Sequence, residues 1–524
     1  MSEKRDKWGS KIGLILAMAG SAVGLGNFWR YPYQAAANGG GAFMIPYIAA
    51  ILLIGVPVAI VEWTAGRYGG VRGFGTLAPM FYLQSREKVN HKKSLILAAI
   101  GGSLGFSICL LCTSYYNQVV GWTLGYSVMS IAGTYMDTAV NTAELYANYI
   151  QTPYLSMTFW VITMIILVVI LKKGINGGIE PVVKVLMPLL YIIGTIIAIR
   201  AVTLGSPVRP DWSAIKGLEF LWTPDWKNLN WNSVLAAVGQ VFFTLALGQG
   251  IIQNYASYVE ESDDIVVSSL ATVSLNEFAE VVLGGTIAIP ITYAFMGPEG
   301  LGSGVGLAFI SLPNVFRTMV GGRFVGVLWF MLLFFAGITT SLALFNYIST
   351  LMQEDMNFSR TKAANVTFWL YIIMGLPIAL EPIITKTSAL AFFTELDNWN
   401  GSYLMVVLGL FEVIIAGWLF KDKFMLEVNK GSIWKVPSWF FNIVIRFITP
   451  TVVAIVLFFS TLEHFKSGYL NLIPEYIKAT PELIPWVVAA RILIIAVFVY
   501  GFIQCYNSTK RKFSEDFKEV KVSK

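Results

Sequence analysis

Apolar stretches long enough to cross a membrane follow one another along the whole chain. A hydrocarbon core of about 30 Å requires about 20 apolar residues in one helix. The pattern predicts twelve such helices, at residues 12–36, 42–66, 95–128, 156–172, 180–202, 232–258, 266–296, 323–353, 364–383, 389–419, 438–462 and 485–507. We therefore expect an all-α integral membrane protein with twelve transmembrane helices.

The first of these stretches is interrupted at its centre. It reads GSAVGLGNFWRYP over residues 20–32, with Gly24 and Gly26 on either side of Leu25. Glycine lowers helix stability by about 1 kcal/mol relative to alanine. A break frees carbonyl groups before it and N–H groups after it, which are ligands for cations and anions respectively. Gly20 and Gly24 also form a G-x-x-x-G packing motif, so this stretch alone fits close helix packing equally well.

The sixth stretch carries a second copy of this pattern. GQVFFTLALGQGIIQNYASY, residues 239–258, has Gly248 and Gly250 around Gln249, 224 residues after the first copy. Because five spans separate the two starts, the two helices are expected to cross the membrane in opposite directions. Glycine-interrupted helices at corresponding positions of two halves are typical of inverted repeats with a binding site near the bilayer midplane.

This repeat predicts the domain organisation. Residues 1–202 form the first half with spans one to five, and residues 203–231 form an extracellular connection. Residues 232–419 form the second half with spans six to ten, and residues 420–524 hold spans eleven and twelve and a cytoplasmic tail. We expect a 5+5 inverted repeat with broken helices one and six, and two peripheral helices outside it.

The distribution of Lys and Arg predicts the orientation. These residues are frequent before the first span and in the loop after the second, whereas residues 129–155, after the third span, contain none. Cytoplasmic loops carry the excess of Lys and Arg, so both termini are expected in the cytoplasm and the chain in the cell (inner) membrane as a multi-pass protein. The net charge of +6 follows from this topology and indicates no nucleic-acid partner.

Little in the sequence suits catalysis or a transition-metal site. Cys109 and Cys112 form a C-x-x-C pair, which fits two small residues one helical turn apart because no βαβ unit or histidine cluster accompanies it. The two histidines, His91 and His464, lie in expected loops. We therefore do not expect an enzyme.

Oxygen-bearing side chains gather near the two breaks. Asn27 follows the first break and Thr244 precedes the second, while Asn276 and Thr339 lie in the seventh and eighth spans. Threonine often only hydrogen-bonds between helices, but four such residues beside broken helices favour coordination of a hard cation. The scarcity of carboxylates favours a monovalent ion.

Six motifs are similar to those of one transporter family. They are WGSKIGLILAMAGSAVGLGNFWRYPYQAAANGGGAFMIPY, SYYNQVVGWTLGY, GQVFFTLALGQG, SLNEFAEVVLGG, LLFFAGITTSLAL and ELDNW. With them the chain resembles the neurotransmitter:sodium symporter family over nearly its whole length, and most closely its prokaryotic leucine-transporter-like branch. The resemblance implies the leucine-transporter fold and a sodium-coupled symporter of a neutral amino acid that works by alternating access.

The resemblance further implies two sodium ions and no chloride. The first ion is expected at the carbonyl of Ala22, the side chains of Asn27 and Asn276, the carbonyl and hydroxyl of Thr244, and the substrate carboxylate. The second is expected at the carbonyls of Gly20, Val23 and Ala336 and the hydroxyls of Thr339 and Thr340. Glu280 lies where chloride-dependent relatives have a neutral residue, so its carboxylate is expected to replace chloride.

The substrate site and the gates follow from the same resemblance. Substrate contacts are expected from Ser21, Ala22, Leu25, Gly26, Cys112, Tyr116, Phe243, Thr244, Ala246, Gln249, Thr340 and Leu344, with the Tyr116 hydroxyl and the Gly26 N–H at the carboxylate. The extracellular gate is expected to be Arg30 with Asp397, capped by Phe243. The cytoplasmic gate is expected to be Arg5 with Glu354 or its neighbour Asp355, capped by Trp8 and Tyr258. Glu62 is expected to support the broken backbone of the sixth span.

Three positions bear on the substrate. Cys112 and Gln249 stand where leucine-type members have bulky apolar groups, and the polar Gln249 argues against a strictly aliphatic side chain. Gly24 stands where amine-specific relatives carry an aspartate, which favours an amino acid over an amine.

Other functional classes remain open at this point. A channel would need a continuous polar file, which the aromatic residues Phe243 and Tyr116 argue against. A nontransporting amino-acid sensor would share the same site. The protein is expected to be a monomer or a homodimer in the lipid bilayer.

Overall fold

The computed structural model describes residues 6–300 and 306–517, and every named element in these ranges is helical. Ten continuous helical segments there are long and apolar enough to span a membrane. They are α3–α4 (Gly41–Gly70), α6 (His91–Ala132), α8 (Pro153–Lys172), η3–α9 (Ile175–Val202), α13–α14 (Ile265–Met296), α16 (Gly322–Met356), α17 (Arg360–Thr385), α18–η9 (Ala391–Leu419), η10–α21 (Phe440–Lys466) and η12–α22 (Pro481–Lys512). Shorter connecting helices are α5 (Leu77–Ser85), α7 (Thr142–Gln151), α10 (Ala214–Trp222), α15 (Leu312–Thr318) and α20 (Lys421–Val428).

Two further apolar segments are broken, at the positions predicted. The first consists of α1 (Lys11–Ala22) and η1–α2 (Gly26–Ala37), which meet at an angle of 49°. The second consists of α11 (Trp231–Thr244) and the short α12 (Ile251–Ala256), separated by residues 245–250. These segments follow the predicted ranges in order. Because α11 is shorter than a span, the count of twelve and the inverted repeat stay predictions.

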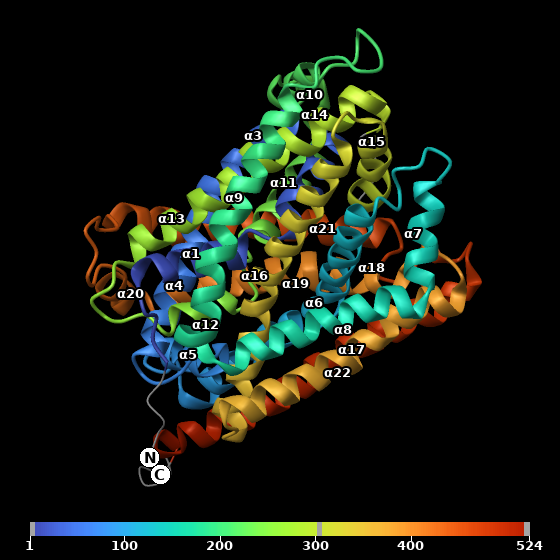
Figure 1. Ribbon diagram of the computed structural model, residues 1–524. Coiled ribbons are helices and arrows are strands. Elements are labelled where there is room, and N and C mark those ends of the chain that lie inside the picture. The colour runs from blue at the N-terminus through green and yellow to red at the C-terminus, as the bar shows by residue number, and fades with distance from the viewer. Residues whose placement is uncertain (1–5, 301–305, 518–524) are drawn as a thin grey trace.

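Helices α6 and α16 pack along each other at the centre of the bundle, with α8, α17 and α22 along one side of them (Figure 1). Glycines allow helix backbones to approach closely, and the van der Waals packing that results helps helices to associate in lipid. At Gly102 of α6, an added Cβ would lie 2.5 Å from the Cβ of Ala78 in α5. The broken α1 packs against α9, α13 and α16, so the first break is enclosed by other helices.

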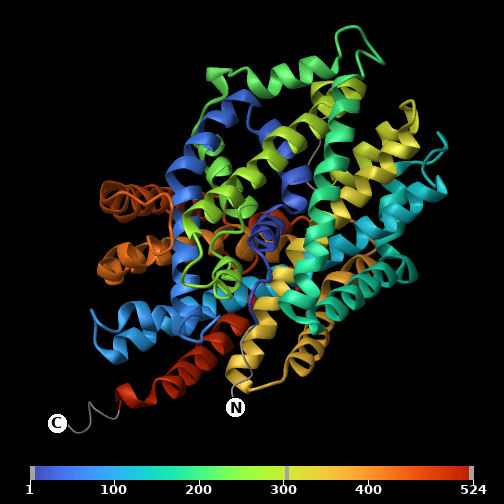
Figure 2. The ribbon, with the colours of Figure 1, turned by 60° about the vertical axis from the view of Figure 1, so that its left-hand side comes forward.

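The start of α1 and the end of α22 reach the same end of the bundle (Figures 1 and 2). There, Asp6 forms a salt bridge with Arg360 at 3.2 Å, and Lys512 forms one with Asp355 at 2.7 Å. Both contacts lie at the turn between α16 and α17. This arrangement agrees with an even number of membrane crossings.

Candidate functional site

At the first break, close packing explains the glycines. Helix α1 ends at Ala22, and the ψ angle of Val23 is 90°, which takes the chain out of helical geometry. A Cβ on Gly24 would lie 2.6 Å from the Tyr116 hydroxyl, and one on Gly26 would lie 2.5 Å from the ring of Phe243. Glycine therefore lets these two aromatic side chains approach the backbone of the break.

At the second break, backbone conformation explains the glycines. Gly248 and Gly250 have φ angles of 64° and 82°, and Ala246 between the helices has a φ of 55°. Side chains other than glycine's are disfavoured in this left-handed region. The Gly248 N–H donates to Oε1 of the buried Glu62 at 2.7 Å, so Glu62 supports this backbone as expected.

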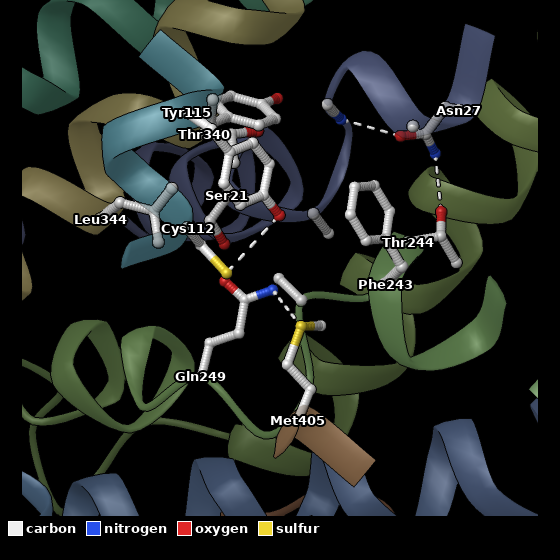
Figure 3. Close-up of a pocket in the computed structure, with 15 residues that line it drawn as sticks. Ser21, Asn27, Cys112, Tyr115, Phe243, Thr244, Gln249, Thr340, Leu344 and Met405 are labelled. Atoms are coloured by element: carbon white, nitrogen blue, oxygen red, sulfur yellow. Dashed lines mark hydrogen bonds between the residues drawn. The ribbon is translucent and has the colours of Figure 1, made fainter. Parts of the chain in front are cut away.

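The two breaks and α6, α16 and α19 (Leu404–Ile414) enclose a cavity (Figure 3). It is lined by Ser21, Ala22, Gly24, Gly26, Asn27, Cys112, Tyr115, Tyr116, Phe243, Thr244, Ala246, Gln249, Thr340, Leu344 and Met405. All the expected substrate residues line it except Leu25. The Leu25 N–H instead donates to the Tyr116 hydroxyl at 3.0 Å, so this residue adjoins the cavity through its backbone.

Sequence reasoning missed two lining side chains. Tyr115 directly precedes the expected residue Tyr116 in α6, and this neighbourhood could have indicated it. Met405 lies on α19, far along the chain, and its sulfur accepts a hydrogen bond from the Gln249 amide at 3.6 Å (Figure 3). No local pattern marks Met405, because its place in the site depends only on how α19 packs.

Buried polar groups from both breaks meet beside the cavity. The Asn27 amide donates to Thr244 Oγ1 at 3.0 Å, to Asn276 Oδ1 at 2.9 Å and to Glu280 Oε2 at 3.0 Å. Its own Oδ1 accepts from the Gly24 N–H at 2.8 Å. Four residues expected near the first sodium are therefore in direct contact.

Glu280 supplies the carboxyl group of this cluster. Its carboxylate accepts hydrogen bonds from the Thr244 hydroxyl, from the Gln240 amide at 2.9 Å and from the Tyr47 hydroxyl at 2.9 Å, besides that from Asn27. The side chain is fully buried. A buried carboxylate is costly unless it is paired or hydrogen-bonded, and the Glu280 carboxylate accepts all four of these bonds.

Oxygen acceptors converge next to this carboxylate. One terminal atom of the Asn276 carboxamide lies 3.2 Å from the carbonyl oxygen of Thr244 and 3.3 Å from that of Ala22. In the orientation in which Asn27 donates to Asn276, this atom is Oδ1. Three oxygens then face one another, which is the environment of a hard cation. Rotation of the amide would instead place its nitrogen there, where it would donate to both carbonyls.

The second group of expected ligands lies between α1 and α16. The Thr340 hydroxyl lies 3.2 Å from the carbonyl oxygen of Gly20 and 3.3 Å from that of Ala336. The Thr339 hydroxyl lies 3.0 Å from the Ala336 carbonyl. Val23 caps the C-terminal end of α1, three residues after Gly20. Hydroxyl and carbonyl oxygens from two helices again converge.

The expected extracellular ion pair is not formed among the described residues. Arg30 donates to Gln240 at 2.7 Å and to Ser402 at 3.3 Å, and its guanidinium lies 4.4 Å from the ring centroid of Phe243. Asp397 accepts from the Tyr115 hydroxyl at 2.8 Å. Both charges thus have other partners at the cavity, and Gln240 connects Arg30 to the Glu280 cluster.

The cytoplasmic gate is described only in part, because Arg5 lies outside the described residues. Trp8 donates to the Tyr255 carbonyl at 3.2 Å and packs edge-on against that ring, whereas the Tyr258 hydroxyl bonds Thr350. Tyr255 is therefore a contact of Trp8 that the sequence did not indicate.

The two candidate acids of this gate share one neighbour, Lys512 near the end of α22. Its ammonium lies 2.7 Å from Asp355 and 3.7 Å from Glu354. Glu354 also accepts from the Gly75 N–H at 2.6 Å and from the Thr76 hydroxyl at 2.9 Å. Both acids therefore contact the C-terminal helix, and Glu354 in addition contacts the loop after α4.

The model of the sodium:neurotransmitter symporter family matches residues 5–147 and 147–507 of this chain. An uncharacterized sodium-dependent transporter of Methanocaldococcus jannaschii is 31% identical over 502 residues, which cover 92% of this chain and 96% of that protein. The sodium- and chloride-dependent glycine transporter 1 of Xenopus laevis is 23% identical over 88% of this chain and 79% of its own length. The crystal structure of MhsT in complex with L-phenylalanine superposes with a TM-score of 0.75 at 30% identity, and covers 87% of this chain and 99% of MhsT.

Proposed function

Because this chain belongs to the sodium:neurotransmitter symporter family, whose members are secondary transporters and not enzymes, we propose that it couples uptake of a neutral amino acid to two sodium ions without chloride. It is a sodium-dependent transporter. The observation that carries the finer proposal is the contact of Asn27, Thr244 and Glu280 between the two broken helices.

The first sodium ion binds where the acceptor oxygens converge. Asn276 Oδ1 supplies one oxygen beside the carbonyls of Ala22 and Thr244. Asn27 Oδ1 and the Thr244 hydroxyl supply two more. The second ion binds at the oxygens of Gly20, Val23, Ala336, Thr339 and Thr340. Oxygen ligands without sulfur or imidazole suit an alkali cation.

The substrate is an amino acid whose carboxylate completes the first sodium site. N–H groups after a helix break attract anions, and the Gly26 N–H and the Tyr116 hydroxyl line the cavity beside Asn27. MhsT binds L-phenylalanine in its crystal structure. The side chain would lie against Cys112, Leu344 and Met405, with Gln249 as the polar member, which supports a neutral amino acid.

The carboxylate of Glu280 replaces the chloride ion. The Xenopus laevis relative is named as sodium- and chloride-dependent, so this family includes members that need the anion. In this chain a buried carboxylate lies within hydrogen-bonding distance of Asn27. It supplies a fixed negative charge next to the first sodium site.

Transport proceeds by alternating access between two halves related as an inverted repeat, with both termini in the cytoplasm. Arg30 and Asp397 flank the cavity through Gln240 and Tyr115, and Phe243 lies between the cavity and Arg30. We propose that Arg30 and Asp397 come together in another state of the cycle.

Uptake into proteoliposomes tests this proposal. A tenfold sodium gradient supplies about 1.4 kcal/mol per ion and a potential of 100 mV about 2.3 kcal/mol per charge. Two ions thus supply about 7 kcal/mol, enough for about a 10⁵-fold substrate gradient. A thermal-shift screen of amino acids with and without sodium identifies the substrate first. Concentrative uptake should then stop when potassium replaces sodium.

Three outcomes would contradict the proposal. Undiminished concentrative uptake in potassium alone would exclude sodium coupling. Sodium-dependent binding without any flux would indicate a sensor. Equal affinity for an amino acid and its decarboxylated amine would contradict the proposed contact between the carboxylate and sodium.

A further inference from the structure

Arg446 stands out among the charged residues of the membrane-spanning segments. It lies six residues into the span η10–α21, about 9 Å along the axis at 1.5 Å per residue. Its Nε is buried without a hydrogen-bond partner, and within residues 6–300 and 306–517 the side chain forms no salt bridge. Ionisable side chains inside a span are costly and are normally paired.

Two buried arginines of this protein have carboxylate partners. Arg67 pairs with Glu427 at 2.9 Å, and Arg491 pairs with Glu395 at 2.8 Å. Arg446 is only half-buried and forms no such pair among the described residues. Its guanidinium is therefore accessible to an anion from outside the chain.

Two aromatic rings hold the guanidinium. Its Cζ lies 4.5 Å from the ring centroid of Trp418 and 5.4 Å from that of Phe447. A Cβ on Gly417 would lie 3.3 Å from the Cα of Arg446, so the two helices approach closely here. An arginine over a tryptophan face uses the face of its guanidinium for this contact, so the N–H donors in the guanidinium plane stay free for an anion.

The nearest acid is already engaged. Lys88 holds the pKa of Asp422 below its usual range, with smaller effects from Lys421 and Arg446. Lys88 forms a salt bridge with Asp422. Arg446 therefore acts on Asp422 only at a distance, and the salt bridge that the structure describes there is made by Lys88.

An apolar groove extends from Arg446 along the outside of the bundle. Its volume is about 580 Å³, and its lining includes Trp418, Arg446, Phe447, Ala454 and Phe458. From Arg446 to Phe458 the helix rises about 18 Å. One leaflet of a 30 Å hydrocarbon core is about 15 Å thick, so the groove has the length of one acyl chain.

We infer that this groove binds an anionic phospholipid of the cytoplasmic leaflet, with its phosphate at Arg446 and one acyl chain along α21. The loop before this span carries Lys421, Lys423, Lys430 and Lys435, which indicates the cytoplasmic side. Anionic lipids concentrate on that side and attract basic residues near the surface. The positive guanidinium is complementary to the negative phosphate of the headgroup, and the apolar groove is complementary to the acyl chain.

Lipid retention by the purified full-length protein tests this inference. The protein in detergent is mixed with equimolar phosphatidylglycerol and phosphatidylcholine of identical acyl chains, and bound lipid is counted by native mass spectrometry. We expect about a fivefold preference for phosphatidylglycerol, which Arg446→Gln removes. Arg209→Gln is the matched control, because Arg209 also lies over a tryptophan, Trp212, at 4.6 Å but outside the groove; it should keep the preference.

A second variant tests the groove itself. Ala454→Trp fills the groove while leaving Arg446 in place, and should reduce retention of both lipids. It also keeps the inference testable if Arg446→Gln does not fold. Equal retention of the two lipids by the wild type, or an unchanged preference in Arg446→Gln, would overturn the inference. Release of phosphatidylglycerol by millimolar inorganic phosphate alone would indicate a site for free anions. An altered oligomeric state of Ala454→Trp in nanodiscs would indicate that a second copy of the chain occupies the groove. Either result would also overturn the inference.

Discussion

The second helix break has three residues with positive φ, whereas the first break, at residues 23–25, has none. Both breaks carry the same G-x-G pattern. In the first, the glycines make room for Tyr116 and Phe243. In the second, Gly248 and Gly250 adopt a backbone conformation that other residues resist. One sequence pattern therefore serves two physical purposes.

The hydrogen bonds that hold the two breaks differ in the same way. At the first, Asn27 Oδ1 accepts from Gly24, and the Tyr116 hydroxyl accepts from Leu25. Both acceptors line the cavity. At the second, the acceptor is Glu62, from α4 and outside the cavity lining. Ligands can therefore compete for the bonds that hold the first break, whereas the second is fixed by the surrounding helices.

The largest expected effect is that of Gly248→Ala. A left-handed residue other than glycine costs about 1–2 kcal/mol, and the added Cβ would overlap the carbonyl oxygen of Met405, which adds about 1–3 kcal/mol of overpacking. We expect a strongly lowered melting temperature and no uptake. Gly24→Ala is the comparison, because its Cβ meets only the ends of the Tyr116 and Thr340 side chains; it should fold and lose mainly ligand affinity. Equal melting temperatures for the two variants would contradict the difference between the breaks.

Glu280 joins the two breaks, since Asn27 of the first and Thr244 of the second both donate to it. Wild-type uptake should be the same in chloride and gluconate. Glu280→Ser removes the fixed negative charge, so uptake should be lost in gluconate and recover at least partly in chloride. Glu280→Gln, which keeps the size but not the charge, is the control for shape. A wild type that stops when chloride is withdrawn would rule out Glu280 as the substitute anion.

A smaller effect is expected from the support of the second break. Glu62→Ala leaves the buried Gly248 N–H without an acceptor, which costs about 1–3 kcal/mol. Glu62→Gln keeps a carbonyl acceptor there and should retain most of the stability. Thermal melts of the purified variants measure this difference. If Glu62→Ala lowers sodium affinity without lowering the melting temperature, the second break belongs to the ligand site and not to the scaffold.

The span ranges could be predicted to within a few residues because apolar length is a local property of the chain. The position of both breaks was also local, since glycine spacing marks it. Contacts between distant helices were not predictable from such patterns. Met405, Tyr255 and the bonds of Arg30 to Gln240 and Ser402 depend on how whole helices pack, and no spacing within one segment encodes them. The sequence does not mark Arg446 for the same reason. That its side chain forms no salt bridge is apparent only from the residues that pack around it.

The smallest expected effect belongs to Tyr116→Phe, which tests whether the first break is coupled to ligand. The change removes the hydroxyl that accepts the Leu25 N–H at 3.0 Å and keeps the ring. One hydrogen bond is worth about 0.5–1.5 kcal/mol, so substrate affinity should fall about 2- to 12-fold. The Leu25 N–H adjoins the cavity, where water can replace the lost hydroxyl, so the melting temperature without ligand should fall less than in Glu62→Ala. Tyr115→Phe is the matched control: the same hydroxyl is removed one residue away, where it bonds Asp397 and not the break. If equilibrium binding of the substrate in sodium weakens equally in both variants, the bond between Tyr116 and Leu25 has no special part in binding. If only Tyr116→Phe weakens it, the Tyr116 hydroxyl, which accepts the Leu25 N–H of the first break, is part of the binding site.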